Sequence, residues 1–135
     1  VTWPYMICAA SDYLDRHPSI THPSQLHSHR WLHFLPVRTT LQNGEESYFL
    51  DIADSIACTH LAAVCRLTES GFGLSLQVGG EVREKIAQGR LKAVLPEWTL
   101  PPVSLYLVTP YRVQSAKTEV AVRIFTESFA KEEDL

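Results

Sequence analysis

The sequence predicts an α/β fold with a mixed sheet, because short strand-like runs alternate with helical runs along the whole chain. One hairpin signal interrupts this alternation: Asn43-Gly44 separates two extended runs, and both residues tolerate positive φ. The chain has 135 residues, of which 45% are apolar and 20% are charged, as is typical of a single globular domain. We therefore expect one sheet that contains both parallel and antiparallel strands.

Two short helices and several strands are expected before residue 54. The strands follow from apolar runs and turn residues: Trp3–Ala9, Trp31–Val37 and the second hairpin strand Tyr48–Ala53. Ser11 is the expected N-cap of a helix that ends near His17. Pro23 opens a second helix that ends near His29, since proline is favoured in a first helical turn. Pro36 predicts an early end for the strand in which it lies.

A longer helix is expected in the middle of the chain. Its apolar residues recur at helical spacing: Ile56, Leu61, Val64 and Leu67. Either Asp54 or Ser55 can cap its start, and Gly71 ends it after Ser70. The elements that follow are a strand, a helix and the glycine that ends this helix: Leu74–Val78, Val82–Ala87 and Gly89.

Two strands and one helix are expected at the end of the chain. The strands are Leu91–Leu95 and Val103–Thr109, with a proline-rich bend around Trp98 between them. Ser115 is the expected N-cap of the last helix. Three apolar residues share one face of this helix, at positions i, i+3 and i+7: Val122, Phe125 and Phe129.

Charge and composition exclude several functions for the chain by itself. Twelve Lys and Arg against fifteen Asp and Glu give a net charge of −3, and the positive charges are scattered, so we expect no binding to DNA phosphates. The sequence has no run of about 18 apolar residues, so we expect no membrane-spanning helix. Three cysteines without a CxxC pair favour a reduced, cytoplasmic chain. The start at Val1 indicates a piece of a longer protein.

Histidine is concentrated in one segment, with five residues within seventeen positions: His17, His22, His27, His29 and His33. Neutral imidazoles of this kind suit a zinc or copper site. However, Trp31–Phe34 is strand-like, and side chains four residues apart in a strand lie too far apart to chelate easily. No carboxylate or thiol lies nearby in sequence to complete the set. We therefore expect solvated loop histidines, with no metal and no other cofactor.

Two patterns that resemble enzyme motifs have simpler interpretations. Cys58 or Cys65 beside His60 could supply a thiol nucleophile, but both cysteines lie on the expected helix, where cysteine behaves as a small hydrophobic residue. The Ser-Gly-Phe-Gly run at 70–73 lacks the third glycine of a dinucleotide-binding loop, and it follows a helix instead of preceding one. We therefore expect a protein that is not an enzyme.

The Asp54-Ser55 pair has two open interpretations. A polar residue at a helix start, just beyond the end of a strand, lies where α/β sheets bind small ligands through free N–H groups. An N-cap without any ligand explains the same pair.

Several motifs, in order along the chain, resemble the C-terminal effector-binding region of LysR-type transcriptional regulators. The most specific is GRLKAVLPEW at 89–98, followed by Pro101-Pro102 and by LYLVTP at 105–110. Upstream, CAASDYL at 8–14 resembles the family's cASPaYL segment, and GFGL at 71–74 resembles its GlGi motif. Arg112 and Ser115-Ala116-Lys117 resemble the start of the helix that closes most members.

This resemblance implies a type II periplasmic-binding-protein-like fold, with a mixed sheet flanked by helices in each of two subdomains that two crossover strands join. Residues 1–109 would form the second subdomain with the crossover strands. Residues 110–135 would form the C-terminal helix that returns to the first subdomain. The DNA-binding winged helix-turn-helix would lie outside this chain. The interval from Asp54 to Gly71 is longer than usual, which leaves the helix start open between Asp54 and Thr59.

The resemblance further implies that the chain senses a small, anionic effector between the subdomains, and that it forms dimers, with tetramers in the full protein. The expected effector-binding residues come from the helix start, the end of the next strand and the second crossover strand: Asp54, Ser55, Thr59, Gln77, Val78 and Tyr106. Thr59 can donate a hydrogen bond to an anion, whereas Asp54 would repel one. A solute-binding protein of similar fold is the alternative, and the sequence does not identify the effector.

Overall fold

A mixed sheet forms the centre of the structure. The computed structural model describes residues 2–78, 80–110 and 115–133. Its central sheet has five strands in the order β6-β3-β7-β2-β8. Their bounds are Tyr5–Ala10 (β2), Trp31–His33 (β3), Ile56–Ala57 (β6), Leu74–Val78 (β7) and Leu91–Val94 (β8). β3 is parallel to β6 and β7, whereas β2 is antiparallel to β7 and β8. The predicted mixed α/β architecture is confirmed.

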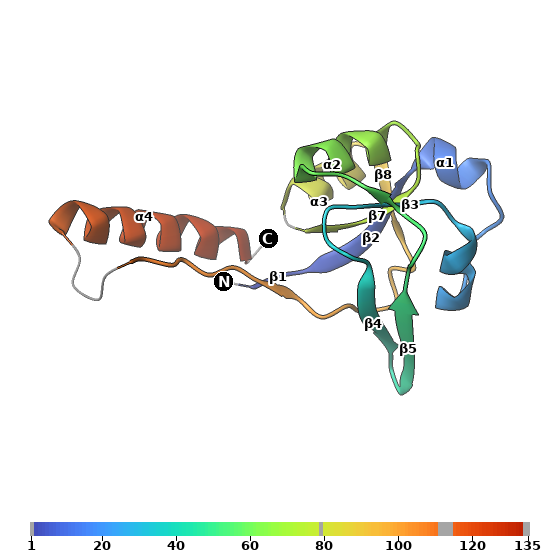
Figure 1. Ribbon diagram of the computed structural model, residues 1–135, viewed down its shortest axis with the longest axis horizontal. Helices are drawn as coiled ribbons and strands as arrows, with labels where there is room; N and C mark the ends of the chain where they lie inside the picture. The colour runs from blue at the N-terminus through green and yellow to red at the C-terminus, as the bar shows by residue number, and fades with distance from the viewer. Residues whose placement is uncertain (1, 79, 111–114, 134–135) are drawn as a thin grey trace.

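Helices and a hairpin cover the sheet (Figure 1). Two helices, α2 (Leu61–Glu69) and α3 (Gly80–Ala87), pack against one face. The other face packs against α1 (Ser11–Asp15), the 3-10 helix η1 (Pro23–Ser28) and a hairpin. The hairpin strands are Arg38–Asn43 (β4) and Glu46–Asp51 (β5).

The alternation of side chains along β2 separates two hydrophobic cores. Successive strand residues point to opposite faces of a sheet. Ile7 and Ala9 therefore belong to the larger core, whereas Cys8 packs with Val82 of α3 and Leu91 of β8. The larger core also takes up fully buried side chains from β3, η1 and the hairpin: Trp31, Leu26, Leu41 and Leu50.

The segment before α2 forms a strand where the sequence predicted a helix. Ile56–Ala57 is extended and pairs in parallel with β3, and the N–H of Cys58 donates to the carbonyl of His33 (2.8 Å). The unpaired edge of β3 lies beside this segment, and pairing with it satisfies the hydrogen-bonding groups of both backbones. The apolar spacing of the segment gives no information about this edge, so the sequence alone favoured a helix. The helix start expected at Asp54 or Ser55 is therefore wrong.

α2 begins at Leu61, with His60 as its N-cap, so the helix starts just beyond the later end of the predicted interval. Cys58 lies before the helix and not on it, which corrects a second expectation. The predicted end is confirmed: Gly71 has φ of +82°, and the N–H groups of Gly71 and Phe72 donate back into the last turn.

Two further boundaries differ from the prediction. Ser11 is the first residue of α1, and its hydroxyl donates to the carbonyl of Gly89 (3.3 Å) without capping the helix. The hairpin forms, but its turn lies one residue later than predicted. Asn43 pairs with Glu46, and Gly44 with φ of +58° begins the turn. Glycine at this position is typical of a type II′ turn.

The predicted strand Val103–Thr109 is paired over only two of its residues in the described part of the chain. β9 (Val103–Ser104) pairs antiparallel with β1 (Thr2–Trp3). The chain then runs to residue 110 without a sheet partner, and α4 (Ala116–Glu133) lies alongside it (Figure 1). Residues 105–110 and α4 are named the arm. The rings of Trp3 and Phe129 meet at 5.6 Å and join the arm to β1.

The last helix begins as predicted. The hydroxyl of Ser115 accepts a hydrogen bond from the N–H of Thr118 (3.4 Å), which is the expected N-cap contact. None of the helices in the described ranges combines the length and the apolar character that crossing a membrane requires.

Candidate functional site

Three parallel strands end at one edge of the central sheet. β3, β6 and β7 run in the same direction, so their carboxyl ends lie together. Tyr5 pairs with Val78 and therefore lies at this edge as well. α2 begins here, directly after β6. This region is named the carboxyl edge, and open α/β sheets bind small ligands at such edges.

The N-terminus of α2 opens at the carboxyl edge without a side-chain cap. The N-cap residue His60 makes no side-chain hydrogen bond to the helix, and the first turn contains no acidic residue. Leu61 and Ala62, at the start of the helix, are both exposed. The first N–H groups of a helix lack internal partners and carry a partial positive charge. This helix end is therefore suited to an anionic group.

Gln77 lies buried on β7, at one end of a hydrogen-bond chain. The hydroxyl of Thr68 donates to the carbonyl of Val64 (2.7 Å) and lies 2.8 Å from the hydroxyl of Ser75. Since the Thr68 proton is already used, Ser75 donates to Thr68, and Gln77 Nε2 donates to Ser75 (2.8 Å). This order leaves Gln77 Oε1 buried, with no hydrogen-bond partner in the described part of the chain.

The structure distributes the predicted effector-binding residues over three places: Thr59, Gln77 and Val78 near the carboxyl edge, Asp54 and Ser55 before β6, and Tyr106 on the arm. Thr59 is exposed and directly precedes the N-cap of α2. Tyr106 is 80% exposed on a segment that leads away from the sheet (Figure 1). Three of the six residues therefore lie near the carboxyl edge.

Sequence reasoning missed His33 and His60 as residues of this edge. His33 ends β3, and its Nδ1 is buried without a partner in the described chain. His33 was considered only as a metal ligand. Its place at the end of an apolar strand in an α/β protein is the signal that points to a ligand-facing edge. His60 has no such signal, because the sequence placed the helix start earlier.

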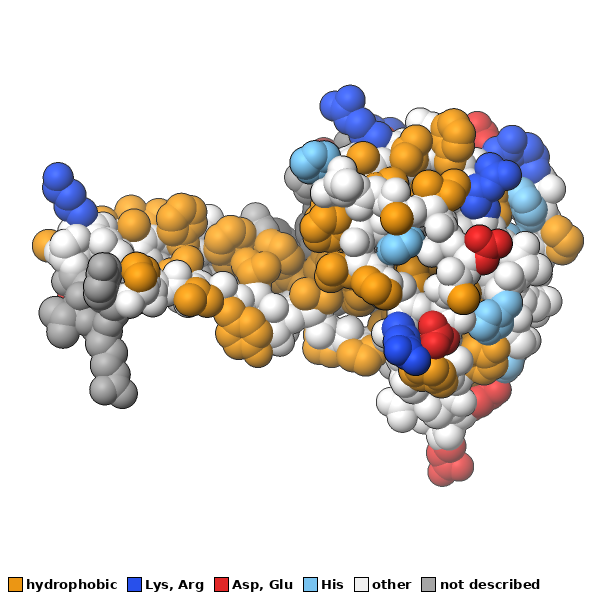
Figure 2. All heavy atoms as spheres, viewed as in Figure 1, with side chains coloured by type: hydrophobic (Ala, Val, Ile, Leu, Met, Phe, Trp, Pro, Cys, Tyr) orange, Lys and Arg blue, Asp and Glu red, His pale blue; other side chains and the backbone are white. Residues whose placement is uncertain are grey.

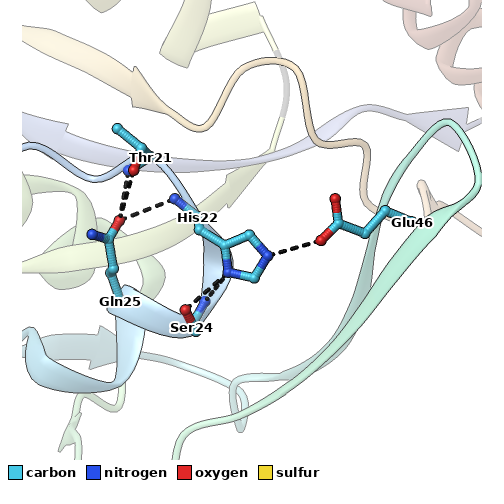
Figure 3. Close-up of polar contacts among 5 residues, drawn as sticks. All are labelled: Thr21, His22, Ser24, Gln25 and Glu46. Carbon is cyan, nitrogen blue, oxygen red and sulfur yellow. Dashed lines mark hydrogen bonds and ion pairs between the residues drawn. The ribbon is translucent and has the colours of Figure 1, made fainter.

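Histidines of the first loop region make defined hydrogen bonds, while His17 and His27 are exposed to solvent as expected. The Nδ1 atom of His22 accepts from the N–H of Ser24 (3.2 Å), which leaves Nε2 to donate to Glu46 (2.9 Å), as Figure 3 shows. Gln25 Oε1 accepts from the N–H groups of Thr21 and His22 (2.7 and 3.0 Å). These contacts attach η1 to the hairpin.

No metal centre is apparent among the described residues, and the buried thiol of Cys8 is not reactive. The described residues contain no group of three or more His, Cys, Asp and Glu side chains that could hold a metal ion. Burial, with a smaller contribution from Cys65, raises the pKa of the Cys8 thiol to about 12. A thiol with such a pKa stays protonated at neutral pH and is a weak nucleophile.

Comparison with known proteins assigns this architecture to a family. The profile of the LysR substrate binding domain matches residues 1–130. The chain belongs to the LysR substrate-binding domain family. The regulatory domain of CrgA, a LysR-type transcriptional regulator from Neisseria meningitidis, is similar in fold. The TM-score is 0.67 at 20% identity, over 98% of this chain and 66% of that chain.

Two further relatives support the assignment. Full-length AphB, a virulence activator of Vibrio cholerae and a member of the LTTR family, has a TM-score of 0.69 at 25% identity, over 76% of this chain and 36% of that chain. The probable HTH-type transcriptional regulator SinR of Salmonella typhimurium is 29% identical over 114 residues, which cover 79% of this chain and 36% of SinR. This LysR domain thus spans little more than a third of SinR's length. The fold and family expected from the sequence motifs are confirmed.

Proposed function

We propose that this LysR substrate-binding domain senses a small anionic effector at its carboxyl edge, as the regulatory part of a transcription factor. One observation carries the proposal: α2 begins where three parallel strands end, with no acidic residue in its first turn and no side-chain cap. N–H groups at such a helix end can bind a carboxylate or a similar anion.

Buried polar atoms beside the edge support the same location. Gln77 is only 1% exposed, yet its Oε1 has no partner in the described chain, and the same holds for Nδ1 of His33. Buried polar groups are almost always hydrogen-bonded, so two unpaired ones near a single edge are unusual. Thr59 adds an exposed hydroxyl next to the helix start. An effector that carries both an anion and a neutral polar group fits this set.

The arm supports the view that the chain forms one wall of a cleft. Its apolar side chains are exposed, as the hydrophobic surface in Figure 2 shows: Leu105, Tyr106, Leu107, Val108, Val120, Ile124 and Phe125. A cavity of about 220 Å³ lies between the extended segment and α4. In this proposal residues 1–109 form the second subdomain with the crossover strands, and the arm packs on a first subdomain outside this chain. Tyr106 would then line the cleft.

The proposed mechanism is a population shift. An effector held between the two subdomains stabilises one arrangement of dimers and tetramers, and this arrangement changes how separate DNA-binding domains meet their sites. DNA contact, cytoplasmic location and the absence of enzymatic activity are parts of this proposal. A solute-binding protein domain is the alternative, but the similarity to SinR, an HTH-type regulator, favours a regulator.

A charge placed at the start of α2 tests the site. We would compare Leu61→Glu with Leu61→Gln, since Leu61 is exposed and is the first residue of the helix. A glutamate here interacts favourably with the helix dipole and repels an anion, and the glutamine variant controls for the loss of the leucine side chain. The probe is sodium succinate, titrated into the chain and followed by NMR of the backbone amides of the first turn of α2.

The expected result is a saturable shift of these amides that Leu61→Glu abolishes and Leu61→Gln retains. Thr59→Ala should weaken the same shift, and Ser55→Ala should leave it unchanged, because only Thr59 adjoins the helix start. Succinate shifts confined to other regions, or equal binding by the glutamate and glutamine variants, would refute the site.

A further inference from the structure

A groove at the opposite end of the sheet takes no part in the proposed effector site. The groove has a volume of about 300 Å³ and is lined by residues of α1, η1, the start of β3 and the turn after α2: Tyr13, Arg16, His17, Ser28, Arg30 and Gly71. These elements flank the ends where β3 and β7 begin, whereas the carboxyl edge lies where the same strands end. Figure 2 shows Lys, Arg and His side chains over the α1 end of the molecule, with acidic side chains beside them.

The lining of this groove contains two guanidinium groups and no carboxylate. Arg16 is held in place because its Nη2 donates to the carbonyl of Gly71 (3.2 Å) and its Nε to the carbonyl of Asp12 (3.1 Å). Carbonyl oxygens orient the guanidinium without neutralising its charge. Arg30 forms no ion pair with the described residues. The carboxylates of Asp12 and Asp15 lie outside the groove, in an adjoining hollow that Arg16 also lines.

Tyr13 and two histidines orient further polar atoms at the groove. The Tyr13 hydroxyl accepts from the N–H of Arg30 (3.2 Å) and pairs with Nδ1 of His29 (3.0 Å). His17 Nδ1 must donate to the carbonyl of Tyr13 (2.7 Å), because a carbonyl only accepts. The backbone bond uses only Nδ1, so Nε2 of His17 is not engaged by it. The centroids of the His17 and Tyr13 rings lie 4.1 Å apart in a stacked arrangement. The lining is therefore organised before a ligand arrives.

The size of the groove indicates more than a simple ion. An adjoining hollow of about 180 Å³ shares His17 and Ser28 with it and reaches Gln25 and His29. Guanidinium groups pair strongly with phosphate oxygens, and Nε2 of His17 offers a further hydrogen-bonding atom at the groove. We propose that this groove binds a small organic phosphate, with Arg16 and Arg30 on the phosphate and the adjoining hollow around the organic part.

Titration of the chain with ribose 5-phosphate tests this proposal, with ribose as the neutral comparison. The binding variant is Arg30→Gln, since Arg30 is exposed and its side chain forms no ion pair with the described residues. The matched control is Arg123→Gln, which removes the same charge from the exposed surface of α4. Calorimetry supplies the affinity, and NMR of the His17 ring and the Gly71 amide locates the ligand.

We expect saturable binding of ribose 5-phosphate but not of ribose. Arg30→Gln should weaken it at least about tenfold, as is typical for loss of a charged hydrogen bond. Arg123→Gln should leave the affinity within about twofold, as expected for an exposed charge distant from the groove. Equal weakening by both arginine variants, equal binding of ribose, or shifts elsewhere in the chain would overturn the proposal. Leu61→Glu should retain phosphate binding, which separates this groove from the carboxyl edge.

Discussion

The sheet-bearing core and the arm use apolar residues in opposite ways. In the core, large side chains such as Leu26 and Trp31 are completely buried. In the arm, Tyr106 is 80% and Val108 87% exposed, although both segments read as apolar in sequence. An apolar sequence pattern therefore predicts a surface that packs against another apolar surface. It does not show whether that second surface belongs to the same chain.

The largest expected contrast is in stability. Leu26→Ala should lower the free energy of unfolding by about 2–5 kcal/mol, because it empties a fully buried position. Leu107→Ala, at a position that is 55% exposed, should change it by less than about 0.5 kcal/mol. Urea unfolding of both variants measures the difference. Similar losses at the two positions would mean that the arm belongs to the core after all.

Self-association should depend on the arm. Exposed apolar surface favours association, so the double variant Leu107→Ser and Ile124→Ser should weaken it at least about tenfold. The control is Leu35→Ser with Phe49→Ser, which removes exposed apolar side chains from the core surface. Sedimentation velocity over a concentration series measures both. If the core variant dissociates more readily than the arm variant, the contacts between copies lie on the core.

A partly buried ion pair should make a smaller contribution. Glu69 joins α2 to Lys85 of α3 (2.6 Å) and lies 3.7 Å from Arg90. The hydrogen bond from Lys85 is the largest cause that lowers the pKa of Glu69 below its ordinary 4.5. Its stabilisation is thus present above that value and is lost as the pH falls through the lowered pKa.

Glu69→Gln should therefore cost about 0.5–1 kcal/mol at pH 7 and little at pH 2–3. Glu127→Gln, on exposed α4, should cost nothing measurable at either pH. Thermal unfolding of both variants at both pH values measures these changes in stability. A loss at Glu69 that persists unchanged in acid would assign the effect to packing.

The smallest expected effect is a pH dependence that arises only in the core. Burial, and then the charge of His17, lowers the pKa of His29 below 6.5. The unfolded chain then binds the proton more readily, so stability falls as the pH decreases from 6.5 through the lowered pKa. Residues 103–135 contain no histidine, so the arm contributes nothing here. His29→Gln should make the free energy of unfolding less dependent on pH between pH 7 and 5. An unchanged pH dependence would mean that another group is responsible for it.

The two ends of α2 show which helix boundaries local sequence patterns can predict. Its end at Gly71 was predicted, because glycine readily adopts the positive φ that terminates a helix. Its start was not, because Ile56–Ala57 satisfies helical spacing and also fits the free edge of β3. The choice depends on a strand more than twenty positions away in sequence. Thr59, as the nearer candidate to the helix start, was therefore a better prediction than Ser55.

The sequence by itself determined the alternation of strands and helices, the hairpin, the helix-ending glycines and the family motifs. These features depend on local periodicity and on backbone preferences of single residues. Only the tertiary structure decided that Ile56–Ala57 forms an edge strand, that Gln77 is buried with an unpaired oxygen, and that the apolar arm is exposed. Each of these depends on which distant segment lies alongside, and strand pairing and burial are set by the whole fold.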